Sequence, residues 1–224
     1  MPQIALPSPN HDSRGGAPVS MLVLHYTGMA SAEAALARLC DPAAKVSAHY
    51  TIGEDGTVYA HVPEDRRAWH AGLSCWAGIR DVNAHSIGIE LINPGHEFGY
   101  RAFPDAQIAA LTSLCKDILA RHAIPAGNVL GHSDVAPARK DDPGELFPWS
   151  QLAHAGIGLW PVAGDADVGA GALERYGYDP EAPLEKRIIA FQRHFRPEKL
   201  SGIWDEECGR RLVALLANRP PFGL

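Results

Sequence analysis

Two histidines, His25 and His132, each end a short apolar run, LVLH in the first case and VLGH in the second. A single histidine in such a place is more often a hydrogen-bonded structural residue than a ligand. Two strands of one sheet would, however, deliver both imidazoles at the same edge, where side chains project into a cleft. Because a catalytic zinc site typically uses three protein ligands and leaves a fourth position to water, we predict a metal site at this edge.

A third ligand is expected from the loop that follows His132, which reads GHSDVAPARKDDPG and contains three aspartates. Asp142 is a reasonable choice, because a loop braced by prolines can fold back toward the histidine that precedes it. Asp134 and Asp141 compete for the role on the residues alone. Asp134 is also a residue type that shapes turns by accepting hydrogen bonds from nearby backbone amides.

Glu90 lies inside the apolar segment IGIELI, where an ionisable side chain costs free energy unless it is paired or functional. It is either a buried carboxylate bonded to a basic residue or a general base that takes a proton from metal-bound water. Lys140, close to Asp142 in the loop, would stabilise an oxyanion in the functional interpretation and would be a solvated surface lysine otherwise.

The other histidines carry weaker predictions. His49 and His61 lie on the two strands of an expected hairpin, and His70 adjoins Trp69 in a segment that belongs either to a binding cleft or to the core. Surface or structural positions are expected for the remaining ones, which are His11, His85, His96, His122, His154 and His194.

The elements that would position these residues follow from hydrophobic periodicity. Runs of β-forming residues predict strands, and apolar positions at helical spacing predict helices after Ser31 and Pro104. The order along the chain is strand 19–26, helix 31–42, a hairpin of 46–52 and 57–62, strand 86–92, helix 104–125 and strand 128–132. Such an order predicts an α/β fold with a mixed central β-sheet flanked by helices.

The chain is expected to divide into unequal parts. Residues 1–18 form an N-terminal arm, 19–149 a catalytic domain, and 150–166 a linker rich in Ala, Gly and Pro. Three amphipathic patterns in 167–224 predict a small C-terminal three-helix bundle, too small to be stable without leaning on the main domain.

Composition limits the classes of partner. The 224 residues are 46% hydrophobic and carry a formal net charge of -6, without a basic run, so nucleic acid is not expected as a partner. No apolar segment reaches the length of a membrane span. The start of the chain has no secretory pattern, which predicts a cytoplasmic protein, or a periplasmic one if a leader has been removed. The four cysteines, without a C-x-x-C pair, are expected to be mostly reduced.

Four segments resemble, in order, the motifs of zinc-dependent N-acetylmuramoyl-L-alanine amidases of the AmpD and AmiD type, a family related to phage lysozyme-amidases and peptidoglycan recognition proteins. They are MLVLHYTG, VSAHYTIGEDGTVYAHVPEDRRAWHAG, NAHSIGIELINPG and GHSDVAPARKDDPG, spread over residues 19–149. Four motifs in register are far more specific than any one of them.

The resemblance implies a role for each matching residue. Zn²⁺ would be bound by His25, His132 and Asp142, which leaves loop-shaping roles to Asp134 and Asp141. The catalytic carboxylate would be Glu90, and the lysine that stabilises the transition state would be Lys140. Contacts with the stem peptide are implied for Arg67 and Arg139, and positions near the cleft for Trp69, His70 and Asn83.

The activity that the resemblance implies is hydrolysis of the amide between (1,6-anhydro-)N-acetylmuramic acid and L-alanine, in muropeptides or in peptidoglycan. The partners would be anhydromuropeptides or murein, in cell-wall recycling or remodelling. The alternative is a non-catalytic peptidoglycan recognition module on the same fold. The segments IIAFQRHF and SGIWDEECGRRLVALL resemble a peptidoglycan-binding domain, so the C-terminal helices are either a glycan-binding module or a structural buttress.

Overall fold

The computed structural model describes residues 3–218 of the chain. Within them, a six-stranded sheet has the order β1-β5-β4-β7-β3-β8. These strands span Ile4–Ala5 (β1), Val58–Ala60 (β5), Tyr50–Ile52 (β4), Ser86–Leu91 (β7), Met21–Tyr26 (β3) and Val129–Gly131 (β8). Strands β4, β7, β3 and β8 run parallel, whereas β5 is antiparallel to β4. The predicted mixed sheet and its hairpin are confirmed.

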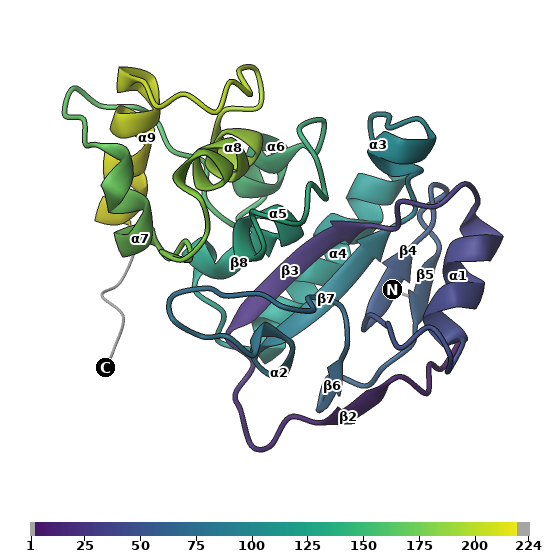
Figure 1. Cartoon of the computed structure of the whole chain (residues 1–224). Helices are drawn as coiled ribbons and strands as arrows, with labels where there is room; N and C mark the ends of the chain where they lie inside the picture. The colour runs from purple at the N-terminus through teal and green to yellow at the C-terminus, as the bar shows by residue number, and fades with distance from the viewer. Residues whose placement is uncertain (1–2, 219–224) are drawn as a thin grey trace.

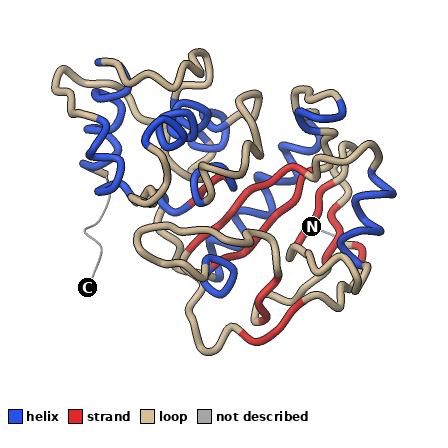
Figure 2. Tube along the Cα trace, viewed as in Figure 1, coloured by secondary structure: helices blue, strands red, loops and turns tan. Residues whose placement is uncertain are grey.

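Helices surround this sheet, as Figures 1 and 2 show. They are α1 (Ala32–Cys40), α2 (Val82–His85), α3 (Gly95–Phe98), α4 (Asp105–Arg121), α5 (His132–Val135), α6 (Trp149–His154), α7 (Leu173–Tyr176), α8 (Leu184–Phe195) and α9 (Glu206–Ala217). Helix α1 begins where the sequence predicts, because the Ser31 hydroxyl accepts a hydrogen bond from the Ala34 N–H at 3.2 Å.

Successive side chains of β3 point alternately into two apolar layers, one on each face of the sheet. Leu22 and Leu24 belong to a core cluster that includes the buried side of α4, which lies behind the sheet in Figure 1. Met21 and Val23 belong to a second cluster on the other face. Because successive strand residues point to opposite faces, His25 shares the face of Met21 and Val23.

The C-terminal helices complete that second cluster. Phe191 and Phe195 of α8 and Leu212 of α9 are buried in the same cluster as Met21 and Val23. Figure 1 shows these helices grouped beside the β8 edge of the sheet. Both parts of the chain therefore fill one core, and the C-terminal unit packs against the sheet as its small size predicts. The division of the chain into separate domains stays a prediction.

The two segments at the predicted boundaries are also structured. Residues 1–18, expected as an extended arm, supply β1 and the strand β2 (His11–Ser13), which pairs antiparallel with β6 (Arg66–Ala68). The segment 150–166, expected as a linker, begins inside helix α6. All four cysteines are free thiols, as expected. In the described part of the chain, no helix has the length and apolar character needed to cross a bilayer.

Candidate active site

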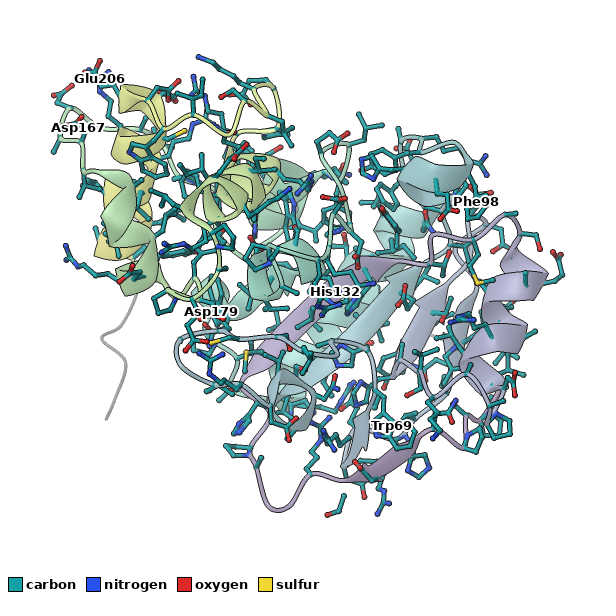
Figure 3. The ribbon with its side chains drawn as sticks, in the orientation of Figure 1. Trp69, Phe98, His132, Asp167, Asp179 and Glu206 are labelled. Atoms are coloured by element: carbon teal, nitrogen blue, oxygen red, sulfur yellow. The ribbon has the colours of Figure 1, made fainter. Side chains whose placement is uncertain are left out.

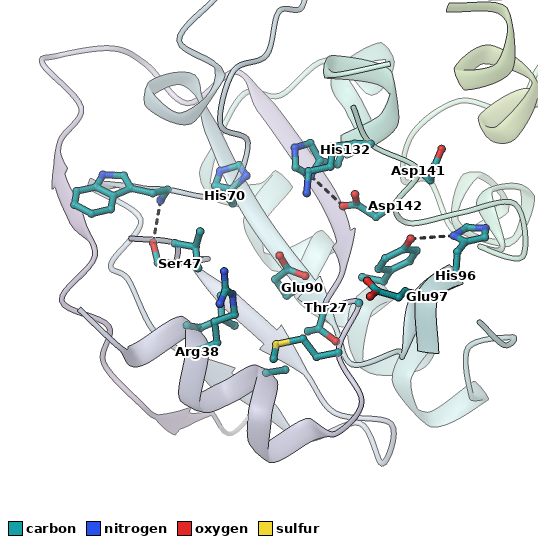
Figure 4. Close-up of a pocket in the computed structure, with 18 of the residues that line it drawn as sticks. Thr27, Arg38, Ser47, His70, Glu90, His96, Glu97, His132, Asp141 and Asp142 are labelled. Atoms are coloured by element: carbon teal, nitrogen blue, oxygen red, sulfur yellow. Dashed lines mark hydrogen bonds and ion pairs between the residues drawn. The ribbon is translucent and has the colours of Figure 1, made fainter. Parts of the chain in front are cut away.

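Strand register brings the predicted site together at one edge of the sheet. His25 on β3 lies opposite Glu90 on the neighbouring β7, so both side chains lie on the same face. Gly131, the last residue of β8, is directly followed by His132 at the start of α5. The loop after α5 then folds back onto the start of that helix, because the Ser133 N–H donates to the Asp142 carbonyl at 2.9 Å. Figure 4 shows Glu90, His132 and Asp142 around one cleft.

Three potential metal ligands converge in this corner. The Nδ1 atoms of His25 and His132 are 3.0 Å apart, and Asp142 Oδ2 lies 3.0 Å from the first and 3.1 Å from the second. All three residues are buried, and they form a group that could hold a metal ion. Ligand atoms 2.0–2.1 Å from a tetrahedral zinc lie about 3.3 Å from one another, close to this triangle.

A chain of hydrogen bonds determines where His25 carries its proton. The Ser86 hydroxyl donates to the Val82 carbonyl at 2.6 Å, so its oxygen must accept from His70 Nε2 at 3.2 Å. His70 Nδ1 is then unprotonated and accepts from His25 Nε2 at 3.0 Å. The His25 Nδ1 therefore presents a lone pair to the corner.

His132 reaches the same protonation state through the backbone. Its Nε2 donates to the Ala71 carbonyl at 3.1 Å, which leaves Nδ1 as an acceptor. Two imidazole lone pairs and one carboxylate thus face each other with no proton between them. That donor set fits a cation, since without one it leaves three buried acceptors in contact.

Electrostatics keep His25 in the form that binds metal. Burial lowers the pKa of His25 to about 4, which keeps the imidazole neutral.

Gly88 makes room for His70. A Cβ built on Gly88 would lie 2.4 Å from Cγ of the His70 ring, far inside van der Waals contact. An isolated glycine in a strand often marks a close approach of this kind. The backbone of His70 is held as well, because Asn83 Oδ1 accepts from the N–H groups of His70 and Ala71 at 3.1 and 2.8 Å.

Glu90 supplies a carboxylate with unused capacity. Its Oε2 is buried and has no hydrogen-bond partner among the described residues. Burial and, to a smaller extent, the negative charge of Asp142 raise the pKa of Glu90 well above its ordinary value, and Lys140 opposes the shift. Within residues 3–218, Glu90 therefore has neither the close basic partner nor the neutralising ion pair that a purely structural carboxylate would need.

The cleft that contains Glu90 has a volume of about 380 Å³. The predicted residues that line it are Trp69, His70, Glu90, His132, Arg139, Lys140 and Asp142. The Arg139 guanidinium donates to the Ala71 carbonyl at 3.0 Å, which ties the loop to the opposite wall.

Two of the predicted residues, Arg67 and Asn83, are not among the described residues that line the cleft. The Arg67 guanidinium pairs with Asp12 at 3.0 Å and Asp81 at 3.2 Å. The Asn83 side chain is buried and bonded to backbone. By contrast, Trp69 lines the cleft and lies toward β6 in Figure 3, away from the C-terminal helices.

Several residues that line the cleft were not selected from the sequence, among them Arg38, His96 and Glu97. Arg38 comes from α1 and is labelled in Figure 4. His96, expected to be superficial or structural, stands at the rim with Glu97, and its Nδ1 lies 2.9 Å from the Tyr26 hydroxyl. The only sequence signal for Arg38 was its position, because it lies in the helix that directly follows the motif of His25.

The family model for N-acetylmuramoyl-L-alanine amidase matches residues 15–145, the segment that carries every one of these ligands. The chain belongs to this amidase family. It is 42% identical to the N-acetylmuramoyl-L-alanine amidase AmiD of Escherichia coli over 230 residues, which cover 88% of this chain and 82% of AmiD. It is 36% identical to the 1,6-anhydro-N-acetylmuramyl-L-alanine amidase AmpD of Enterobacter cloacae over 67% of this chain and 87% of AmpD.

Solved structures of family members superpose over most of this amidase. The structure of E. coli AmiD with the substrate anhydro-N-acetylmuramic acid-L-Ala-D-γ-Glu-L-Lys matches with a TM-score of 0.81 and 40% identity, over 92% of each chain. AmpDh3 of Pseudomonas aeruginosa matches with a TM-score of 0.78 and 36% identity, over 88% of this chain and 91% of AmpDh3. These comparisons confirm the predicted family and the predicted fold.

Proposed function

We propose that this amidase is a zinc enzyme that hydrolyses the amide between (1,6-anhydro-)N-acetylmuramic acid and L-alanine. The observation that carries the proposal is the corner where two imidazole lone pairs and the Asp142 carboxylate converge beside the unpaired carboxylate of Glu90. Nitrogen and oxygen donors in a set of three are typical of catalytic zinc. Bound there, zinc would lower the pKa of a water toward about 7 and polarise the scissile carbonyl.

Glu90 is the proton carrier in this proposal. Its raised pKa brings it toward the range in which a carboxylate can both accept and release a proton near neutral pH. The carboxylate takes a proton from the attacking water and passes it to the nitrogen of L-alanine, so that the amide C–N bond breaks and a neutral amine leaves. The lactyl group of the muramic acid becomes a carboxylate, and the proton that its new carboxyl group loses is taken up by the released amine, which becomes an ammonium.

Cationic side chains around the cleft suit the rest of the substrate. Lys140 lies in the loop between Arg139 and Asp141, where its ammonium would stabilise the oxyanion that forms at the carbonyl. Arg139 and Arg38 line the same cleft and would meet the carboxylates of a stem peptide. Trp69 would form an apolar wall beside them.

The preferred substrate is a soluble anhydromuropeptide. AmiD and AmpDh3, which match this chain over 92% and 88% of its length, have been solved with anhydromuramic peptides bound. We expect the compartment to follow the substrate, since polymeric murein is met outside the cytoplasmic membrane. Comparing turnover of the soluble peptide with turnover of isolated sacculi therefore tests the preferred form of the substrate.

The experiment compares zinc-loaded protein, metal-free protein and a Glu90→Gln variant on anhydro-N-acetylmuramyl-tripeptide, with products resolved by liquid chromatography and mass spectrometry. Zinc-loaded protein is expected to release the free tripeptide. Glu90→Gln is expected to lose at least 99% of that rate because it lacks the general base. Metal-free protein is expected to lose at least as much because it lacks the group that activates the water. A zinc-loaded wild type that leaves both the soluble peptide and sacculi intact contradicts the proposal.

A further inference from the structure

The loop of residues 131–145, here called the ligand loop, carries His132, Lys140 and Asp142. Its ties to the rest of the chain include the Tyr100 hydroxyl, which donates to the Pro143 carbonyl at 2.8 Å, and the Arg139 guanidinium, which donates to the Ala71 carbonyl at 3.0 Å. Figure 3 shows that His132 lies where the sheet meets the C-terminal helices. The C-terminal segment makes polar contacts with the ligand loop near both of its ends.

The first contact is the carboxylate of Asp134, which is fully buried two residues after His132. One oxygen accepts from the Tyr178 hydroxyl at 2.7 Å. The other accepts from the Gly131 N–H at 2.7 Å and pairs with His194 Nδ1 at 2.7 Å. Tyr178 and His194 both belong to the C-terminal segment, so two of the three groups that satisfy this carboxylate come from outside the loop.

The His194 ring is itself held firmly. It stacks on Trp149 with ring centroids 3.6 Å apart and on Phe195 at 3.8 Å, and it is 3% exposed. An imidazole clamped between two aromatic rings has little freedom to follow a moving partner. The His194 ring therefore fixes the position of Asp134, and with it the start of α5, relative to the C-terminal core.

The second contact is at the other end of the ligand loop. Arg193, next to His194 on α8, places Nη2 2.9 Å from Asp141 Oδ1 and Nε 3.7 Å from Glu145 Oε2. Its side chain is 9% exposed, whereas the side chains of Asp141 and Glu145 are 61% and 29% exposed, so a buried guanidinium is paired with carboxylates that reach water. Figure 4 shows Asp141 directed away from the cleft while Asp142 faces His132.

We propose that Tyr178, Arg193 and His194 are positioning residues, through which the C-terminal unit fixes the ligand loop so that His132 and Asp142 meet at the metal. The contacts with Asp134 lie two residues after His132. The contacts of Arg193 with Asp141 and Glu145 lie on either side of Asp142. The C-terminal unit then acts on the metal site of its own chain, which a module built only to bind glycan would not do.

This inference rests on the proposed zinc site. Partners one shell beyond a metal ligand commonly change metal affinity 10–100-fold when they are removed. Because Arg193 acts through the backbone next to Asp142 and not on the ligand itself, we expect the lower end of that range.

The test compares two arginines of α8. Arg193→Met removes the pairs with Asp141 and Glu145. Arg187→Met is the matched control, because the Arg187 side chain is 8% exposed and pairs at 3.1 Å with Glu174, within the C-terminal unit. Zinc dissociation constants are measured by chelator competition, together with the visible spectrum of the Co²⁺ form and the melting temperature of the metal-free proteins.

Arg193→Met is expected to weaken zinc binding about tenfold and to alter the cobalt spectrum, while Arg187→Met keeps the wild-type zinc affinity at a similar melting temperature. Tyr178→Phe, which removes only the hydroxyl that reaches Asp134, is expected to weaken zinc binding in the same direction. Equal zinc affinities for the two arginine variants overturn the inference, whether both are lowered or neither is.

Zinc affinity is measured without substrate. A wild type that binds zinc but leaves muropeptides intact would therefore contradict the proposed function, and the comparison of Arg193 with Arg187 would still decide this inference.

Discussion

Gly88 offers a test of the hydrogen-bond chain that orients His25. In Gly88→Ala the new Cβ would lie 2.4 Å from Cγ of His70, whereas ordinary contacts are 3.4–4 Å. The ring must therefore retreat by about 1 Å, which stretches the 3.0 Å bond between His70 Nδ1 and His25 Nε2 beyond hydrogen-bonding distance. His25 then loses the partner that selects its tautomer.

The expected cost follows from the loss of one partner behind a metal ligand. Zinc affinity should fall 10–100-fold, equivalent to about 1.4–2.7 kcal/mol, and kcat/KM at limiting zinc should fall with it. Overpacking should also lower the free energy of unfolding by about 1–3 kcal/mol. Zinc affinity is measured by chelator competition and stability by urea denaturation of the metal-free protein.

Gly171→Ala is the matched control, since nothing lies within 4 Å of a Cβ built at Gly171. A double-mutant cycle with His70→Ala identifies the route of the effect. If Gly88→Ala acts by displacing His70, it should weaken zinc binding little further once the ring is absent. Wild-type zinc affinity in Gly88→Ala, or an undiminished loss in the His70→Ala background, would refute the reasoning.

Three further outcomes are expected. Glu90→Gln should lower kcat 10²–10⁴-fold while one zinc per chain is retained, checked by steady-state kinetics and metal analysis, and loss of the metal would contradict a proton-carrier role. Lys140→Met should lower kcat 10²–10³-fold with little change in stability, and unchanged kcat would return Lys140 to a solvated loop lysine. Burial and the charge of Arg14 lower the pKa of His49 to about 3. Because the unfolded chain takes up this proton near pH 6.5 and the folded chain near pH 3, His49 should cost about 1.4 kcal/mol of unfolding free energy per pH unit as pH falls between these values. Urea denaturation from pH 7 to 4 should show a shallower decline for His49→Gln, and equal slopes would contradict the low pKa.

The long elements were predictable because their patterns are local. The apolar run of β3 and the helical spacing of α4 appear in contiguous residues, and Pro104 precedes the helix as expected. The three-residue strands β2 and β6 escaped prediction, because their pairing joins residues about 55 apart in the chain and each is too short to show alternation.

The proposed metal ligands and Glu90 could be selected from the sequence because each lies in a motif. The groups that orient them could not, since Ser86, Gly88 and His70 meet only after the sheet has formed. One signal was present in Gly88, an isolated glycine in an apolar strand, which often marks a close approach. The link from Asp134 to His194 had no such signal, because it spans 60 residues and crosses into the C-terminal unit.

The central claim, hydrolysis of the lactyl-L-alanine amide, is tested most directly by turnover in ¹⁸O-labelled water. Zinc-loaded protein is incubated with anhydro-N-acetylmuramyl-tripeptide, and each product is weighed by mass spectrometry. We expect one ¹⁸O atom in the muramic acid carboxylate and none in the released tripeptide. Label in a peptide carboxylate would place the cut at another bond, and an intact substrate would contradict the activity itself.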